Sequence, residues 1–491
     1  MNTILSLKPG AIWRHFYGLT QIPRPSGYCS AVAGHIENFG RELSLEVLRD
    51  GIGNVCIRKP ATAGYEGSPT VILQAHLDMV PQADDPDFDF TQKPVEAIID
   101  GQWVRAAGTT LGADNGIGVA AIMAVLEASD LRHGPIEGLF TVDEETGMYG
   151  AEAIESGFIN GKIMLNLDSE LDGELYIGCA GGENISATIS YSEESYVATK
   201  REEDVKMTIS LSGLKGGHSG VDIHLGRANA NKLLARFLRE AEKTVSMRLI
   251  SLAGGNMRNA IPREASATVI VCGEKACRDI EILAEEYKAT LIKEFEDIED
   301  PEKLSIDTKR EKPEEILRFI PFAVKEKLIN VLNSCPNGVI NMFSEKIPDT
   351  VETSVNMSIV NTSDNRAEVK FLARSSSKSK KKAICSSIES AFDNAGADVY
   401  FDGNYPGWDP DYNSSVLGTM KKVFEKQRGY SPAVKVMHAG LECGIILAKI
   451  PGLDTVSFGP TIKHPHSPAE KVEIESVGKF WEFLTAVLEN I

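Results

Sequence analysis

Metal-binding chemistry is first indicated by acidic and imidazole side chains that directly follow apolar runs. His76 and Asp78 follow the run 71–75, and Asp168 follows the run 162–167. Side chains alternate along a strand, so His76 and Asp78 share one face, where the carboxylate can hold the imidazole tautomer whose other nitrogen binds a metal. A histidine at a strand end is often structural, and this segment alone leaves both interpretations open.

Asp114 lies in a second such segment, the glycine-bounded stretch 112–118, which leads into an apolar helical pattern. Glycines remove backbone crowding around a carboxylate, which can then reach two metal ions with one oxygen each. An acid before an apolar helix is also a routine N-terminal cap. The local pattern does not choose between a bridging ligand and a cap.

Three consecutive acids, residues 143–145, follow the apolar run 138–142, and two histidines, His464 and His466, stand near the C-terminus. Adjacent carboxylates repel one another unless solvent or a cation compensates their charge. Exposed turn acids would explain the triplet equally well in isolation. Together, however, all these segments form a mixed nitrogen and oxygen set, which suits zinc, and a shared carboxylate supports two ions about 3.5 to 4 Å apart.

The elements that must position these residues alternate apolar runs with helical patterns, as expected of an α/β layer architecture. In open α/β sheets, sites gather where strand ends meet loops. After residue 180 the pattern changes to strands with one long helix on each side of the segment 297–315, which is rich in proline and charge and is predicted to be a solvated connection. We therefore predict an α/β domain in residues 1–184 and 402–491, interrupted by an inserted α+β domain of two similar halves at 185–401.

The composition excludes several classes of protein. The 491 residues carry a formal net charge of −19, which argues against a nucleic-acid partner because phosphate binding needs a basic surface. No uncharged apolar run approaches the about 18 residues that span a bilayer, and the chain opens without a signal-peptide pattern, so we expect a cytoplasmic protein with no membrane partner. The eight cysteines are scattered without Cys-x-x-Cys spacing, which predicts free thiols.

Seven motifs, in order, resemble those of the zinc-dependent aminoacylase and carboxypeptidase superfamily, and within it the aminoacyl-histidine dipeptidase branch. They are His76-Leu77-Asp78, Gly112-Ala113-Asp114-Asn115-Gly116, Asp143-Glu144-Glu145-Thr146-Gly147, Asn166-Leu167-Asp168-Ser169-Glu170, Gly217-His218-Ser219-Gly220, Ala439-Gly440-Leu441-Glu442-Cys443-Gly444 and His466-Ser467-Pro468. The resemblance covers most of the chain. It implies a catalytic domain with a mixed central sheet flanked by helices, into which a lid domain is inserted.

The resemblance also implies two zinc ions per chain, for which cobalt or manganese could substitute. His76 and Asp168 would hold one ion, Glu145 and His466 the other, and Asp114 would bridge them.

Catalytic roles follow from the same resemblance. Asp78 would orient His76, and Glu144 would be the general base that takes a proton from a water shared by the two zinc ions. The resulting zinc-bridged hydroxide would attack the peptide carbonyl, and Glu144 would pass the proton to the leaving amine. His218 matches the family's lid histidine, which would donate to the developing oxyanion, although a surface loop histidine would fit the same glycine-rich segment.

Substrate recognition is assigned to two further lid residues. Asn259 resembles the family's lid asparagine, and Arg374 resembles its lid arginine, whose planar fork suits a free carboxylate. Against this, composition alone indicates that the run 374–382 is a solvated loop. Glu442 would lie in a glycine-acid loop beside the metals, in a structural or an amine-binding role.

The function implied is metal-dependent hydrolysis of dipeptides, either Xaa-His or a broader set, with a small dipeptide as the partner and a homodimer as a further expectation. Catalysis would require the lid to close over the substrate. An N-acyl amino-acid deacylase on the same dinuclear site is an alternative, since both reactions break an amide beside a free carboxylate. A non-catalytic metal- or peptide-binding protein is a third, although Glu144 would then have no task.

Overall fold

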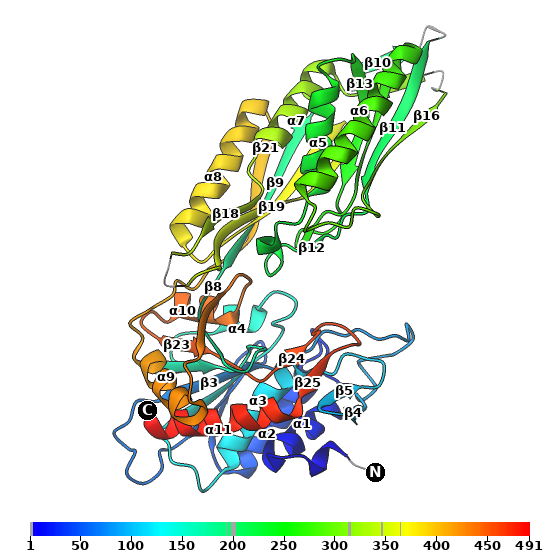
Figure 1. The fold of residues 1–491 in the computed structure, drawn as a ribbon. Coiled ribbons are helices and arrows are strands. Elements are labelled where there is room, and N and C mark those ends of the chain that lie inside the picture. The colour runs from blue at the N-terminus through cyan, green and yellow to red at the C-terminus, as the bar shows by residue number, and fades with distance from the viewer. Residues whose placement is uncertain (1–2, 193, 198–202, 313–315, 345–346, 364) are drawn as a thin grey trace. The chain divides into compact units, whose positions relative to one another are not determined.

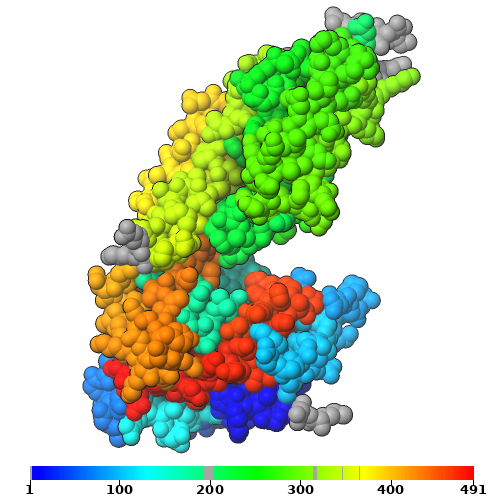
Figure 2. All heavy atoms as spheres, in the orientation of Figure 1, coloured from blue at the N-terminus to red at the C-terminus, as the bar shows by residue number. Residues whose placement is uncertain are grey.

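The computed structural model describes all residues except 1–2, 193, 198–202, 313–315, 345–346 and 364. It divides into two compact units (Figure 1). The first unit comprises Met1–Cys179, Trp408–Val436 and Leu441–Ile491, and the second comprises Ala180–Gly407 and Met437–Gly440. In the space-filling view the C-terminal segments of the first unit, in red, lie against its N-terminal segments, in blue and cyan (Figure 2).

The transitions between the units differ slightly from the expected boundaries at 184/185 and 401/402. Strand β9 (Gly181–Ser190) and strand β21 (Asp398–Tyr405) pair with each other inside the sheet of the second unit, so this unit begins earlier and ends later than expected. The short segment Met437–Gly440 also belongs to the second unit, which the sequence did not predict.

The first unit is built on an eight-stranded mixed sheet. The strand order is β1-β2-β6-β3-β7-β23-β8-β22. The central strands β6, β3, β7 and β23 are parallel to their neighbours in this group, and the β1-β2, β2-β6 and β23-β8 pairs are antiparallel. The bounds are β1 (Glu46–Arg49), β2 (Val55–Lys59), β3 (Val71–His76), β6 (Ile136–Thr141), β7 (Ile163–Asn166), β8 (Glu174–Cys179), β22 (Ala433–Met437) and β23 (Asp454–Ser457). The predicted mixed sheet is confirmed.

The three central strands that precede the candidate residues are buried along their whole length. Every residue of β3, β6 and β7 is buried, as is typical of parallel strands covered on both faces. In the register, His76 pairs with Thr141 and Gln74 pairs with Asn166. The carboxyl ends of these strands therefore meet at one edge of the sheet, and the loops that follow them leave from adjacent positions.

Helices flank this sheet, as expected (Figure 1). They are α1 (Gly10–Thr20), α2 (Ser30–Glu42), α3 (Ala113–Glu127), α4 (Tyr149–Ala153), α9 (Ser415–Arg428), α10 (Glu442–Lys449) and α11 (Ile474–Asn490). Helix α3 is apolar on all sides, and all but two of its residues are buried. A small sheet of order β24-β25-β5-β4 completes the unit, with β4 (Ala97–Asp100), β5 (Trp103–Ala106), β24 (Ile462–Lys463) and β25 (Lys471–Glu473), and a 3-10 turn, η1 (Ile4–Ser6), lies near the start.

The second unit contains a nine-stranded antiparallel sheet whose two halves have the same topology. One half has the order β16-β11-β15-β13 and the other the order β21-β9-β20-β19, with β18 paired to β19. Numbered along the chain, each half is strand, helix, two strands, helix, strand, with the spatial order 4-1-3-2. The halves join where β13 pairs with β19. This agrees with the two similar halves expected from the sequence.

The elements of the second unit enclose a large apolar core that includes residues from both halves, and a small separate cluster consists of Ile223, Ile261 and Val351. The strands of the second unit are β9, β10 (Glu194–Val197), β11 (Asp204–Ser212), β12 (Gly217–His218), β13 (Met247–Gly254), β14 (Ala260–Ile261), β15 (Ala265–Cys272), β16 (Ser305–Glu311), β17 (Ile316–Phe319), β18 (Gly338–Met342), β19 (Val351–Ser363), β20 (Arg366–Ser375) and β21. Its helices are η2 (Ile223–Leu225), α5 (Ala230–Ala241), α6 (Gly273–Glu294), α7 (Phe322–Ser334) and α8 (Lys378–Ala395).

One expected connection contains a strand instead. The segment 297–315 was predicted to be a solvated linker, but β16 lies within it and pairs with β11 along seven residues. Its polar composition reflects its position at the edge of the sheet, where charged side chains discourage pairing with another chain.

Two other expectations can be compared with the structure. All eight cysteines are free, and all but Cys272 are buried. Among the described residues, no helix combines the length and apolar character that a membrane crossing needs.

Candidate metal centre

His76 is the last residue of β3, and three carboxylates surround its ring. The Nδ1 atom lies 3.3 Å from Asp78 Oδ1. The Nε2 atom lies 3.1 Å from Asp114 Oδ1 and 3.3 Å from Asp168 Oδ1. The predicted pair His76 and Asp168 is therefore brought together, and the same His76 nitrogen also lies beside Asp114 Oδ1.

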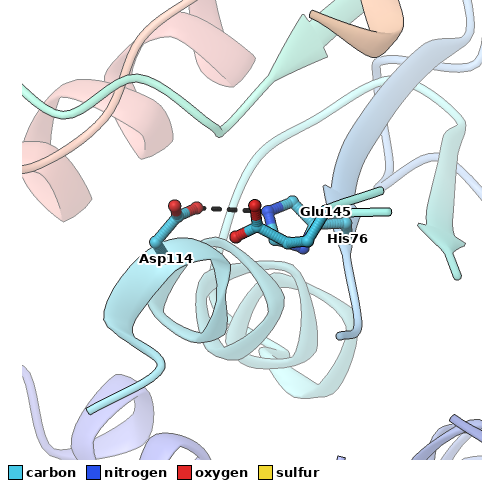
Figure 3. Close-up of side chains that lie close together, drawn as sticks. All are labelled: His76, Asp114 and Glu145. Carbon is cyan, nitrogen blue, oxygen red and sulfur yellow. Dashed lines mark hydrogen bonds and ion pairs between the residues drawn. The ribbon is translucent and has the colours of Figure 1, made fainter. Parts of the chain in front are cut away.

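The second oxygen of Asp114 faces a different pair. His466 Nε2 lies 3.1 Å from Asp114 Oδ2 and 3.1 Å from Glu145 Oε1. Figure 3 shows Asp114 at the start of α3 with His76 and Glu145 turned toward it. One candidate ligand atom each from His76, Asp114 and Glu145 lie within 4.8 Å of one another. The carboxylate of Asp114 thus lies between two groups, each with one imidazole nitrogen and one further carboxylate.

This set of donors fits two divalent cations. Zinc accepts imidazole nitrogen and carboxylate oxygen together, and a carboxylate with one oxygen toward each ion is the usual bridge in two-metal sites. Glu145 Oε1 is buried and accepts no hydrogen bond from any described residue, although the His466 nitrogen lies near it. Burying a carboxylate oxygen without a hydrogen bond costs free energy unless a cation lies beside it. His464, the competing histidine, adopts a positive φ of 56° in the loop, and its carbonyl oxygen accepts a hydrogen bond from Ser467 Oγ at 2.8 Å.

The electrostatics of the centre show the same need for positive charge. Burial, together with neighbouring acids, raises the pKa values of Glu144, Glu145 and Asp168. The hydrogen bond to Asp114 and the negative charge of Glu145 raise the pKa of His466 to about 11. Without a metal, protons on the imidazoles supply charge that divalent cations would otherwise bring.

Asp78 does more than the predicted orientation of His76. It is fully buried, and its Oδ1 accepts a hydrogen bond from the Glu144 amide at 3.0 Å. Its Oδ2 accepts from the Glu145 amide at 3.1 Å and from Ser26 Oγ at 2.8 Å. Burial alone would raise the pKa of Asp78, but the hydrogen bond and charge of His76 outweigh it and lower this pKa. One carboxylate therefore fixes both the His76 ring and the backbone that carries the two glutamates.

The other predicted residues belong to the second unit. His218 lies in β12, and its Nδ1 accepts hydrogen bonds from the amides of Gly220 and Val221, each at 3.2 Å. An Nδ1 that accepts must be unprotonated, so the ring proton resides on Nε2, where it can be donated. Asn259 is exposed, and it adjoins Ala260, the residue that pairs with His218 between β12 and β14.

Arg374 is buried rather than solvated. Its side chain is 5% exposed, and Nη1 donates to Tyr405 Oη at 2.8 Å. The loop interpretation of the run 374–382 is wrong for this residue because β20 continues to Ser375 and α8 begins at Lys378. The Nε atom of Arg374 is buried without a hydrogen-bond acceptor among the described residues. This donor without an acceptor is consistent with a guanidinium that binds an anionic group of a ligand.

Three further acidic or basic residues support the centre, of which the sequence singled out only Glu442. Glu442 is 0% exposed, and its Oε2 accepts from Gln74 Nε2 at 2.5 Å and from Thr141 Oγ1 at 2.7 Å. These contacts join it to the ends of β3 and β6, which carry Gln74 and Thr141. Arg24 and Glu470 are also buried, and both contact the segment that carries Asp114. They are single residues far apart in the sequence, with no local pattern that could have marked them.

Comparison with known proteins gives the same picture. Residues 72–490 match the model of the peptidase family M20/M25/M40. The chain is 42% identical to the cytosol non-specific dipeptidase of Escherichia coli over 492 aligned positions, which cover 100% of this chain and 99% of that protein. It also resembles the crystal structure of aminoacylhistidine dipeptidase from Vibrio alginolyticus, with a TM-score of 0.90, 43% identity, and coverage of 100% of this chain and 98% of that one. The aminopeptidase PepT of Bacillus cereus, with a TM-score of 0.57 and 18% identity, shares the fold.

The buried Glu442 gives a prediction for the metal-free protein. Burial raises the pKa of Glu442 from 4.5 to about 7. A raised pKa contributes stability that is present below pH 4.5 and lost as the pH rises through about 7. In Glu442→Gln the amide oxygen can still accept from Gln74 and Thr141, but no charge forms. After removal of metal with a chelator, we expect this variant to exceed the parent in stability by about 3 kcal/mol at pH 8 and by much less at pH 5.

The measurement is denaturant unfolding of both proteins at the two pH values. Glu475→Gln is the matched control, because Glu475 forms an exposed ion pair with Lys479 at 2.9 Å. A difference between Glu442→Gln and the parent that does not depend on pH would show that Glu442 titrates normally.

Proposed function

Because the chain belongs to the peptidase family M20/M25/M40, we propose that it is a dinuclear metal-dependent dipeptidase whose two ions share Asp114. The observation that carries this proposal is the pair of separate contacts made by the two oxygens of Asp114, one toward His76 and one toward His466. A single-metal site would need only one of these histidines near the carboxylate. His76 and Asp168 hold the first ion in this proposal, and Glu145 and His466 hold the second.

Zinc is the proposed metal, two ions per chain, with cobalt or manganese as substitutes that the oxygen-rich set would accept. When bound, the ions polarise the substrate carbonyl and lower the pKa of the attacking water toward neutrality. The residues of the chain must then position the substrate, move one proton and stabilise one developing negative charge.

Glu144 is the proposed general base. Asp78 holds its backbone amide, and the adjacent Glu145 is committed to the metal group, so the two glutamates have different tasks. Burial and the charges of nearby acids raise the pKa of Glu144, which suits a carboxylate that must accept a proton and later release it. It takes the proton from the attacking water and delivers it to the leaving amine.

Residues of the second unit are proposed to complete the reaction. His218 carries its proton on Nε2, from which it donates to the developing oxyanion. Arg374 and Asn259 are proposed to bind the substrate, and the planar fork of Arg374 suits its free carboxylate. Catalysis would then depend on closure of this unit over the bound dipeptide.

The proposed substrates are free dipeptides, including Xaa-His, because one relative is named a non-specific dipeptidase and another an aminoacylhistidine dipeptidase. The name of the first relative also supports the proposed cytoplasmic location. Neither the deacylase nor the non-catalytic alternative is favoured by these relatives. The homodimer stays a prediction, and the doubled sheet of the second unit could take the place of a partner's lid within one chain.

The role of Glu144 predicts the behaviour of Glu144→Gln. This variant should retain zinc and dipeptide binding, since the metal groups and Asp78 are unchanged, but kcat should fall by a factor of about 10² to 10⁴ or more. Asp143→Asn is the control, because Asp143 Oδ1 accepts a hydrogen bond from the Gly27 amide instead of facing the ligands. Turnover near the parental level in Glu144→Gln would remove the assigned base.

The role of His218 predicts a separation of kcat from binding. In His218→Ala, kcat should fall by about 10² to 10³ while the substrate dissociation constant changes little, because the lost donor serves the transition state. His224→Ala, which alters an exposed histidine of the same unit, should leave both values unchanged. An unchanged kcat in His218→Ala would contradict the oxyanion role.

The substrate class is tested with a panel of free dipeptides, tripeptides and N-acetylated amino acids, with metal analysis on the same preparation. We expect hydrolysis of dipeptides, little hydrolysis of the longer or blocked compounds, and two zinc ions per chain. Preference for the N-acetylated compounds would favour the deacylase. Full zinc occupancy without hydrolysis of any compound would favour the binding protein.

A further inference from the structure

The turn that carries Asp114 is held by a carboxylate that the catalytic roles do not use. Glu470 accepts hydrogen bonds from four consecutive amides: Oε2 from Leu111 at 2.7 Å and Gly112 at 2.9 Å, and Oε1 from Ala113 at 2.8 Å and Asp114 at 3.2 Å. Glu470 is 2% exposed. Ala113 and Asp114 begin α3, and amides at the start of a helix have no partner within it, while Leu111 and Gly112 directly precede the helix. A single buried side chain therefore satisfies four successive amides at this helix start.

The same turn needs this support because its backbone is irregular. Asp114 and Asn115 have non-helical dihedral angles of φ −80°, ψ 110° and φ −105°, ψ 31° inside the segment assigned to α3. Regular helical hydrogen bonds therefore do not fix the direction of the Asp114 side chain. An external acceptor with two oxygens, each taking two amides, can do so.

Arg24 holds the carbonyl side of the same region. Its Nη1 donates to Leu77 O at 2.9 Å and to Asp78 O at 3.0 Å, and its Nη2 donates to Gly112 O at 2.5 Å. Arg24 is 2% exposed. One guanidinium therefore ties Leu77 and Asp78, which directly follow His76 at the end of β3, to the turn that carries Asp114.

The glycines of the motif fit around this arginine. A Cβ added at Gly112 would lie 2.4 Å from Arg24 Nη2, and one added at Gly116 would lie 2.7 Å from the same atom. Both distances are too short for real atoms. The two glycines are thus required for the approach of Arg24, in addition to relieving crowding around Asp114.

We propose that Arg24 and Glu470 are positioning residues that together fix the Asp114 carboxylate between the two metal groups. They hold opposite sides of one turn: Glu470 binds its amides, and Arg24 binds the Gly112 carbonyl and the neighbouring strand end. Their charges are opposite, so the buried pair adds no net charge beside an already acidic centre. This inference rests on the proposed dinuclear centre, because it assigns the reason why Asp114 can serve both ions.

The test measures the zinc affinity of Glu470→Gln by competition with a chelator of known affinity. A glutamine can accept with only one oxygen, so some of the four amides lose their acceptor and Asp114 is less well fixed. We expect the zinc affinity to fall about 10- to 100-fold, as for other residues that orient metal ligands. With zinc in excess, kcat should fall while KM stays near the parental value. Glu475→Gln removes the same charge from an exposed ion pair and should leave zinc affinity unchanged.

Gly116→Ala is the second variant and decides the matter if Glu470→Gln does not fold. Alanine has a higher helix propensity than glycine, but its methyl group would lie 2.7 Å from Arg24 Nη2 and 2.9 Å from Phe16 Cε2, so both side chains would have to move. A lower zinc affinity in a folded Gly116→Ala protein supports the positioning role. Parental zinc affinity and kcat in either folded variant would overturn it. If the parent itself binds fewer than two zinc ions, the proposed dinuclear centre fails instead, and the two failures are therefore distinguishable.

Discussion

The structure depends on one half-buried carboxylate that two histidines share. Each oxygen of Asp114 faces a separate imidazole nitrogen at 3.1 Å, and each imidazole has a further carboxylate beside it. So many acids cannot be buried together as anions without compensating cations, since burial and mutual repulsion raise their pKa values. A centre of this kind is stable only when positive charge occupies it, which connects the fold to metal binding.

The strands and loops around the centre hold these imidazole and carboxylate groups in position. Three parallel strands end at one edge of the sheet, so that His76, the two glutamates and Asp168 leave from adjacent positions. Asp78 holds the glutamate backbone with two hydrogen bonds and the His76 ring with one contact, and a hydrogen bond from Ser26 holds Asp78 itself. The second unit provides residues of a different kind, a neutral histidine with a defined tautomer and a buried arginine with an unused donor. In the proposed reaction, the first unit binds the metal ions and moves the proton, and the second binds the substrate and its developing charge.

Much of this centre could be predicted from the sequence because ligands in such sites follow strands within short motifs. The segments marked His76, Asp114 and Asp168, whereas the resemblance to a known family selected Glu145 within the acidic triplet and His466 over His464. These five side chains lie together in the structure. The antiparallel halves of the second unit could be anticipated from repeated strand and helix patterns, whereas β16 could not, because an edge strand can be as polar as a loop. Arg24 and Glu470 could not be predicted either. Both side chains bind backbone atoms of residues that are far away in the sequence. Every residue has a backbone carbonyl and nearly every residue has an amide, so the residue types of these partners give no sign of the contacts.

The most direct test of the shared carboxylate is anomalous X-ray diffraction from crystals of the zinc-loaded protein. Two zinc peaks should lie about 3.5 to 4 Å apart, one beside each oxygen of Asp114, with His76 and Asp168 at one peak and Glu145 and His466 at the other. A single peak at full zinc occupancy, or two peaks of which only one is beside Asp114, would contradict this account.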